Sequence, residues 1–231
     1  MPRASSKTAP PAPASARQRR KAARPQELLE AALALFVEKG FAATRSEEVA
    51  ARAGVSKGTL YLYYPSKEEL FKAVVRESFG TKIAEGVSEL GKHQGSMAEL
   101  LTWMLWSWWE RMGRTPAGGI HKIMMSEARN FPELAAFYND EVIEPSCALL
   151  AEVVRRGVAS GEFRDVDPDA AVMVLIGPML HLVLHEHSIG AAGPTHDHKP
   201  EPEKVLQLQL ELMFEGLLNR PRGGTSPAAA A

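Results

Sequence analysis

The sequence predicts an all-α protein with an N-terminal three-helix domain and a larger helical domain behind it. Apolar residues recur every three or four positions in most of the 231-residue chain, as they do on one face of a helix. The apolar and polar alternation that is typical of strands is absent. Residues 44–67 contain two short polar segments joined by a glycine, a pattern that indicates two helices with a tight turn between them.

The first helix is expected to begin at Pro25, because proline is favoured in the first turn of a helix. Its apolar stripe, which ends before Gly40, consists of Leu28, Leu29, Ala32, Leu35 and Phe36. Residues 1–23 are rich in Pro, Ala, Ser and basic side chains, so a disordered tail is expected there. Two roles remain open for the basic residues between Arg17 and Lys21, an arm that contacts DNA and a solvated tail.

The stretch that follows predicts a helix, a turn and a second helix. Thr44 and Glu47 have the spacing of a capping box, which predicts a helix start. Gly54 is expected to supply the sharp turn. Ser56 is a favoured N-cap for the second short helix.

The second short helix starts with Lys57, Gly58 and Thr59, which offer a cation, no side chain and a hydroxyl. A glycine inside a helix costs about 1 kcal/mol relative to alanine, so close approach of the backbone to another molecule is a reason for it. Such a start is typical of a helix that enters the major groove of DNA. Three amphipathic helices without a role in nucleic-acid binding are the alternative, and they would leave the polar start unexplained.

A longer helix is expected after Pro65, with Ser66 and Glu69 as a second capping box. Its apolar period continues through Ile83 and Val87, so this helix should link the small domain mechanically to the rest.

These residues resemble the N-terminal domains of TetR/AcrR-type transcriptional regulators, which carry a pattern like I-A-x-x-A-G-V-S-x-G-T-x-Y-x-Y-F-x-x-K-x-x-L. A threonine precedes this pattern in the family, as Thr44 does here, and the other matching residues are Val49, Ala50, Ala53, Gly54, Val55, Ser56, Gly58, Thr59, Tyr61, Tyr63, Tyr64, Lys67 and Leu70. Val49 replaces the usual isoleucine, and Tyr64 replaces the usual phenylalanine. The resemblance covers about residues 25–75 and implies a DNA-binding domain over residues 24–75.

The resemblance implies that Lys57, Gly58 and Thr59 enter a major groove and that neighbouring side chains hold phosphates, with Arg45 also a candidate for reading a base. The full set of candidate DNA-binding residues is Thr44, Arg45, Ser46, Ser56, Lys57, Gly58, Thr59, Tyr61, Tyr63, Tyr64 and Lys67.

The charge distribution agrees with phosphate binding at one end of the molecule. Residues 1–78 hold 14 Lys and Arg against 8 Asp and Glu, and residues 79–231 hold 13 against 20. A basic module on an acidic body is therefore expected.

The chain is expected to be cytoplasmic, without a membrane partner. Cys147 is the only cysteine, so a reducing compartment is indicated. The N-terminal residues lack the apolar segment of a secretion signal. The apolar segment 170–184 is short and contains Pro178 and His181, which favours a buried helix over a membrane span.

Residues 76–220 are expected to form the larger domain, with helices near 96–113, 118–129, 132–160, 167–188 and 201–219, followed by a disordered tail at 221–231. Glu144-Pro145 is expected to kink or split the 132–160 helix. The last two helices are candidates for the interface of a homodimer. The apolar stripe expected in that interface is Leu206, Leu210, Met213, Phe214 and Leu217.

The helix at 96–113 holds all four tryptophans and is apolar nearly all round, so it is expected to be buried or to surround a cavity. The resemblance implies a ligand pocket in this domain, and dense core packing is the alternative for each residue. The candidate ligand-binding residues are Trp103, Trp106, Trp109, Glu110, His121, Met124, Glu127, Phe137, Met179 and His181. A carboxylate near aromatic rings would suit a cationic ligand, whereas Arg111 or Arg129 would suit an acid, and the sequence does not choose.

No cofactor, metal or catalytic site is expected. His181 and His185 share a helix face, but the spacing of known zinc motifs is absent. GxSxG, Walker-type and Rossmann glycine patterns are also absent, so an enzyme is not indicated.

The sequence therefore predicts a homodimeric repressor that binds a palindromic operator and is released by a small apolar or amphipathic effector. Its half-sites should lie about one helical turn, roughly 34 Å, apart or somewhat more. The alternatives are an activator or a ligand-blind regulator of the same fold, and a non-specific DNA-binding protein.

Overall fold

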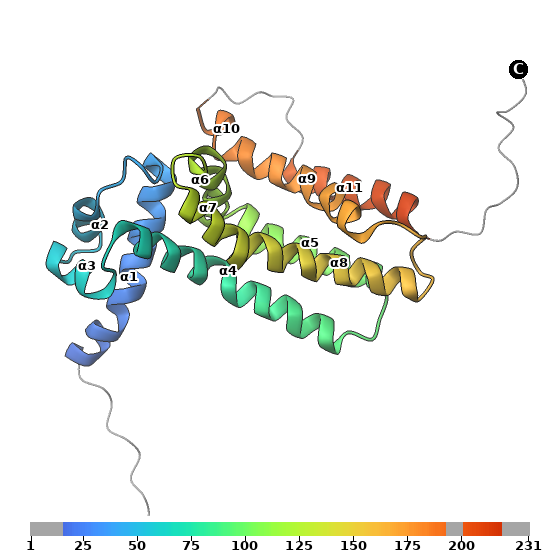
Figure 1. Ribbon diagram of the computed structural model, residues 1–231, viewed down its shortest axis with the longest axis horizontal. Coiled ribbons are helices and arrows are strands. Elements are labelled where there is room, and N and C mark those ends of the chain that lie inside the picture. Colours follow the sequence, from blue (N-terminus) through green and yellow to red (C-terminus); the bar gives the residue numbers. More distant parts are fainter. Residues whose placement is uncertain (1–15, 193–200, 219–231) are drawn as a thin grey trace, which may run out of the picture.

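The computed structural model describes residues 16–192 and 201–218, and these residues are almost entirely helical. Within them no strand forms, although Phe163 and Leu218 make an isolated antiparallel bridge. A small group of helices at one end leads through a long helix into an elongated bundle (Figure 1). The all-α prediction is confirmed.

Four helices build the N-terminal domain: α1 (Ala16–Lys39), α2 (Ser46–Arg52), α3 (Lys57–Tyr63) and the first turns of α4 (Lys67–Lys92). The rings of Phe36, Phe41 and Phe71 meet at its centre, with centroids 5.2–5.6 Å apart. Such tilted and edge-on pairs add to the free energy that burial of the rings already provides.

Helix α1 begins at Ala16, so the predicted start at Pro25 and the predicted disorder of residues 16–23 are wrong. The reason is local. Alanine, arginine, glutamine and lysine are good helix formers, and together they extend the helix upstream of the proline. Residues 1–15 and the predicted tail at 221–231 lie outside the described residues.

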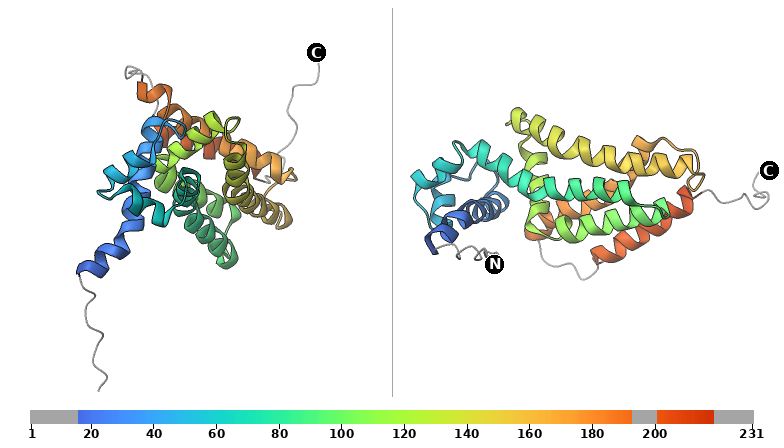
Figure 2. Two further views of the ribbon diagram at one scale, coloured as in Figure 1. Left: turned by 60° about the vertical axis from the view of Figure 1, so that its left-hand side comes forward. Right: turned by 90° about the horizontal axis from the view of Figure 1, so that it is seen from below.

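Helix α4 runs without a break from the N-terminal domain into the bundle, as predicted. The other bundle helices are α5 (Met97–Trp108), α6 (Gly119–Glu127), α7 (Pro132–Tyr138), α8 (Glu144–Ala159), α9 (Pro168–Glu186), α10 (Ile189–Ala192) and α11 (Pro202–Leu217). Helices α4, α5 and α8 lie beside one another along the bundle (Figure 2).

The predicted helix at 132–160 is split near Pro145, as expected. Helix α7 passes through a π-helical turn, Asn139–Ile143, into α8, and Pro145 lies in the first turn of α8. Proline cannot donate a backbone hydrogen bond, and a π-turn at this point accommodates the lost bond.

The buried residues form two cores. The first begins at α1–α4 and continues into the larger domain through Ile120, Met124 and Leu134. The second packs α5, α8, α9 and α11 together. Because the first core crosses from one domain to the other, the N-terminal domain is packed on the bundle rather than tethered to it.

The apolar stripe predicted for a dimer interface lies in the second core instead. Leu206, Leu210 and Leu217 are buried, and Met213 and Phe214 pack against them. The exposed apolar side chains of α9 and α11 lie on other faces, and each is more than half exposed: Met173, Val174, Leu208 and Leu212. The stripe prediction was wrong, because periodicity shows that a face is buried but does not show against what.

The segment 170–184, predicted to be a buried helix, is only partly buried. Within the described residues, Pro168–Ala191 is long and apolar enough to cross a membrane by length and composition, and 22% of its most apolar window is buried. Core helices of soluble proteins pass the same test.

Replacement of Trp109 by alanine is expected to destabilise the protein by about 3–5 kcal/mol, because Trp109 fills the second core at 1% exposure. Urea unfolding at a fixed protomer concentration would measure this loss. The matched control is Trp103→Ala on α5, the helix that directly precedes Trp109, and it should cost far less because Trp103 is 43% exposed. Equal losses in the two variants would contradict the assignment of Trp109 to the core.

Candidate DNA-binding surface and ligand pocket

Helices α2 and α3 are joined by a tight turn that depends on glycine. Gly54 has φ +65°, a left-handed conformation that side chains rarely adopt. The N–H of Val55 donates to the carbonyl of Ala50 at 2.9 Å, which closes the turn. Leu60 is buried against Val49 and Ala50 in the first core, so the angle between the two helices is fixed.

Helix α3 is capped as predicted. The hydroxyl oxygen of Ser56 accepts from the N–H of Thr59 at 3.1 Å, and the two hydroxyls share a further hydrogen bond of 2.9 Å. Half of the predicted capping box at Ser66 is confirmed, because its hydroxyl oxygen accepts from the N–H of Glu69 at 3.1 Å. The Glu69 carboxylate instead accepts from Lys72 at 2.9 Å.

The predicted capping box of Thr44 and Glu47 is wrong. Helix α2 begins at Ser46, and the carboxylate of Glu48 accepts from the N–H of Arg45 at 3.2 Å. Thr44 is 1% exposed, and its hydroxyl lies 2.7 Å from the carbonyl oxygen of Gly40. Its hydroxyl thus ties the end of α1 to the start of α2.

Several predicted DNA-binding side chains are exposed on the N-terminal domain. Arg45, Ser56, Lys57, Gly58 and Tyr61 are exposed. Thr59, Tyr63 and Tyr64 are half-buried, whereas Ser46 is buried. The structure therefore brings the start of α3 and its tyrosines together but leaves the side chains of Thr44 and Ser46 inside.

Leu62 is a surface residue that the sequence reasoning missed. It is 84% exposed on α3, between the two tyrosines. The signal was available, because a residue two positions after the buried Leu60 lies on the opposite side of a helix. An apolar side chain there can contact the methyl group of thymine in a major groove.

Lys57 is held at the surface by an ion pair with Glu47, and its ammonium lies 5.7 Å from the centroid of the Tyr61 ring. The hydrogen bond to Glu47 raises the pKa of Lys57 above its usual value. Both side chains are exposed, so the pair contributes little to stability. A phosphate can take the place of the carboxylate.

Lys67 is occupied within the protein. Its ammonium donates to the carbonyl of Phe41 at 2.9 Å and to that of Ala42 at 3.2 Å, and it lies 4.5 Å from the centroid of the Phe41 ring. Its role in this structure is to hold the turn between α1 and α2.

The same turn contacts the larger domain. The N–H of Ala42 donates to the Glu127 carboxylate at 3.3 Å, and the ring of Phe131 meets that of Phe41 edge-on at 4.8 Å. Glu127, predicted as a ligand-binding residue, instead joins the end of α6 to the N-terminal domain.

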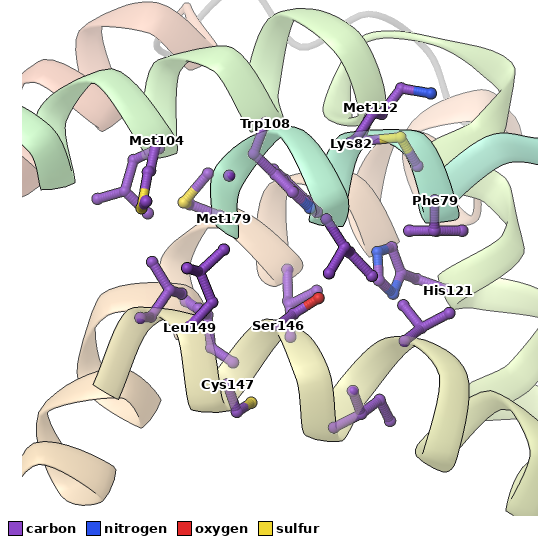
Figure 3. Close-up of a pocket in the computed structure, with 18 of the residues that line it drawn as sticks. Phe79, Lys82, Met104, Trp108, Met112, His121, Ser146, Cys147, Leu149 and Met179 are labelled. Atoms are coloured by element: carbon purple, nitrogen blue, oxygen red, sulfur yellow. The ribbon is translucent and has the colours of Figure 1, made fainter. Parts of the chain in front are cut away.

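A cavity of about 330 Å³ opens in the larger domain between α4, α5, α6, α8 and α9 (Figure 3). Four predicted residues line it, namely Trp103, His121, Met124 and Met179. Further lining residues include Phe79, Lys82, Trp108, Ser146, Cys147 and Leu149. The volume and the largely apolar lining are those of a small-molecule site.

Two of the predicted tryptophans are absent from the lining. Trp109 belongs to the second core, where its indole N–H donates to the Glu203 carboxylate at 3.4 Å. Trp106 is half-buried and packs against the same core. The sequence could not separate these residues from Trp103, because α5 is apolar on almost every face.

Three other predicted ligand-binding residues lie elsewhere. Glu110 is at the surface, paired with Arg114 at 2.8 Å. The ring of Phe137 has the guanidinium of Arg76 above it at 4.8 Å. His181 is exposed on α9.

His121 is the most perturbed titratable group in the lining. Burial, with a smaller contribution from His187, lowers its pKa to about 4, so the ring is neutral at pH 7. The Tyr138 hydroxyl lies 2.6 Å from its Nδ1 atom, and burial raises the pKa of Tyr138. The Nε2 atom is buried and has no hydrogen-bond partner among the described residues.

These features define a two-domain, helix-turn-helix DNA-binding protein whose larger domain contains a pocket. The chain belongs to the TetR family of bacterial regulatory proteins. Residues 28–74 match the model of that family's DNA-binding part, and residues 92–193 match that of a tetracycline-repressor-like C-terminal domain. It is therefore a transcriptional regulator of a DNA-binding family.

Similar curated proteins include the regulator YfiR of Bacillus subtilis, 29% identical over 64% of this chain and 72% of the relative. The repressor KstR2 of Mycolicibacterium smegmatis is 28% identical over the same shares. Among solved structures, FadR of Bacillus subtilis in complex with stearoyl-CoA has a TM-score of 0.67 at 21% identity, covering 83% of this chain and 98% of that one. A Saccharomonospora viridis regulator in complex with choline has a TM-score of 0.69 at 20% identity, covering 87% and 100%. These structures support the fold.

Thr44→Val is expected to destabilise the protein by about 1–2 kcal/mol, because it leaves buried carbonyl oxygens without their donor. Chemical denaturation would measure the loss. Arg45→Ala, one residue away and exposed, is the control and should change stability by less than about 0.5 kcal/mol. If Thr44→Val kept native stability but bound DNA more weakly and with less salt dependence, the result would instead support the predicted contact between Thr44 and a phosphate.

Proposed function

We propose that the protein is a ligand-responsive repressor, cytoplasmic and homodimeric, that binds a palindromic operator and is released by a small apolar or amphipathic molecule. The observation that carries this proposal is the course of α4. It begins at Lys67, which holds the turn beside the helix-turn-helix, and farther along it lines the pocket with Phe79, Lys82 and Ile83. An occupant of the pocket therefore contacts a helix that also belongs to the N-terminal domain.

In the operator complex, Lys57, Gly58 and Thr59 enter the major groove, and Leu62 lies beside them. Arg45, Ser56, Tyr61 and Tyr63 supply phosphate contacts from the same exposed or half-buried surface. Thr44 and Lys67, by contrast, act by holding the turn that positions α2.

Helix α6 gives the ligand a second route to the N-terminal domain. His121 and Met124 line the pocket, and Glu127 at the end of the same helix accepts from Ala42. A ligand changes operator affinity only through its different affinities for the bound and released conformations, typically by about 1–3 kcal/mol.

The dimer forms through α9 and α11, by the face on which Met173, Val174, Leu208 and Leu212 are exposed. A two-fold axis would place the same face of a second copy against it, and the four helices would remove these side chains from water. The name of the relative KstR2, a repressor, favours repression over activation.

Footprinting on the DNA upstream of the protein's own gene tests the proposal. At physiological salt we expect a discrete palindromic footprint with the wild-type protein. Lys57→Ala should weaken it and reduce the dependence of log affinity on log salt by about one ion, because one positive charge is removed from the DNA interface. Lys92→Ala, at the far end of α4, is the control. Salt-sensitive protection without a defined boundary would instead indicate a non-specific DNA-binding protein.

Leu212→Glu is expected to convert the dimer to a monomer, because it places a charge within an apolar interface. Sedimentation velocity would detect the change, and operator affinity should fall with it. Val87→Glu places the same charge on a similarly exposed apolar site of α4 and should leave the dimer intact. Dimers in both variants would show that α11 is not the interface.

A further inference from the structure

The charged residues that line the pocket are both cations. Lys82 projects from α4, and Arg111 lies in the π-helical turn after α5. No aspartate or glutamate is part of the lining, which consists of described residues only. Glu110 and Glu127, the carboxylates that the sequence offered to a cationic ligand, lie outside it.

Of these two cations, Lys82 is the less compensated. Arg111 pairs with Glu85 at 2.5 Å. Lys82 is half-buried and donates to the backbone carbonyl of Ser78, and no described carboxylate lies within salt-bridge distance of it. Burial and the nearby positive charge of Arg111 lower the pKa of Lys82, although the carboxylates of Glu77 and Glu85 oppose this shift. An anion placed beside Lys82 would relieve both effects.

An unsatisfied polar atom of His121 lies toward the same end of the pocket. The tautomer in which the Tyr138 hydroxyl donates to Nδ1 of His121 carries the proton of the neutral imidazole on Nε2. That N–H is buried without a partner among the described residues. An unpaired buried donor costs free energy, so a ligand that brought an acceptor oxygen to it would gain affinity.

The pocket thus has a polar end and an apolar end. Figure 3 shows Lys82 and His121 at the end marked by Phe79 and Met112, with Met104, Met179 and Leu149 toward the other end. The rings of Phe79 and His121 are 5.4 Å apart, which confirms that they are neighbours. Thioether and aliphatic groups adapt well to a flexible hydrocarbon chain.

We propose that the effector is an amphipathic anion, with its carboxylate at the Lys82–His121 end and its hydrocarbon chain toward Met104 and Met179. This inference rests on the proposed function and adds the chemical class of the ligand. A cation of the same shape would be repelled by Lys82 and would find no carboxylate in the lining, and an uncharged molecule would leave the Lys82 ammonium without an anionic partner in the pocket.

Three probes of equal chain length test the sign of the charge: decanoate, decylammonium and decanol, each below its micellar concentration. Fluorescence of the pocket residues Trp103 and Trp108 reports binding, and isothermal titration calorimetry checks the affinities. We expect decanoate to bind most tightly at pH 7 in the full-length protein. Absence of decanoate binding, or binding of decylammonium or decanol that equals or exceeds it, would overturn the inference.

Lys82→Met removes the charge and keeps most of the side-chain volume. It should weaken the binding of decanoate at least about tenfold, which corresponds to the loss of one charge-assisted hydrogen bond, and leave the affinity for decanol unchanged. Lys92→Met on the same helix is the matched control and should change neither affinity. Equal losses for decanoate and decanol, or no loss for either, would contradict the role of Lys82.

Failure of this inference is distinguishable from failure of the proposed function. If decanol or decylammonium released the footprinted operator as well as decanoate did, the inference of an anionic ligand would be wrong and the proposed repressor function would still hold. The lack of a discrete footprint would overturn the repressor whatever the probes do.

Discussion

The relation between the two domains depends on the ring of Phe41. It is buried between Phe36 and Phe71 of the N-terminal domain and meets Phe131 of the larger domain at 4.8 Å. Lys67 covers the ring and holds the carbonyls of the same turn. Because close-packed interiors transmit displacement rather than absorb it, a shift of Phe131 must move the turn from which α2 begins.

This contact gives the pocket a physical route to the DNA-binding surface. The first core contains Met112 and Met124, which also line the pocket, and continues to Leu60, the buried residue of α3. A ligand that moved α6 would strain the Glu127–Ala42 hydrogen bond and the Phe41–Phe131 contact together. The effect of a ligand on operator affinity measures this coupling.

Local chemistry was sufficient to predict the helix-turn-helix, because Gly54, Ser56 and the second cap at Ser66 act through their immediate neighbours. The helix spans of the larger domain followed from periodicity for the same reason. The identity of the residues that line the pocket could not be predicted in this way. Trp103, Trp106 and Trp109 occupy one apolar helix, and only the packing of α8, α9 and α11 decides which of them meets a cavity. The role of Thr44 was also missed, since its partners are carbonyls that its own turn brings close.

The sequence of α9 supports the proposed dimer over contact with lipid as the partner of its exposed face. Val172, Leu175, Met179 and Val183 recur at helical spacing and are buried within the chain, so one face is committed to the bundle. The exposed face carries Met173 and Val174 but also Pro178 and His181. A lone helix embedded in hydrocarbon would gain nothing from that mixture. Two such faces packed about a two-fold axis would bury the apolar side chains and leave the polar ones at the rim.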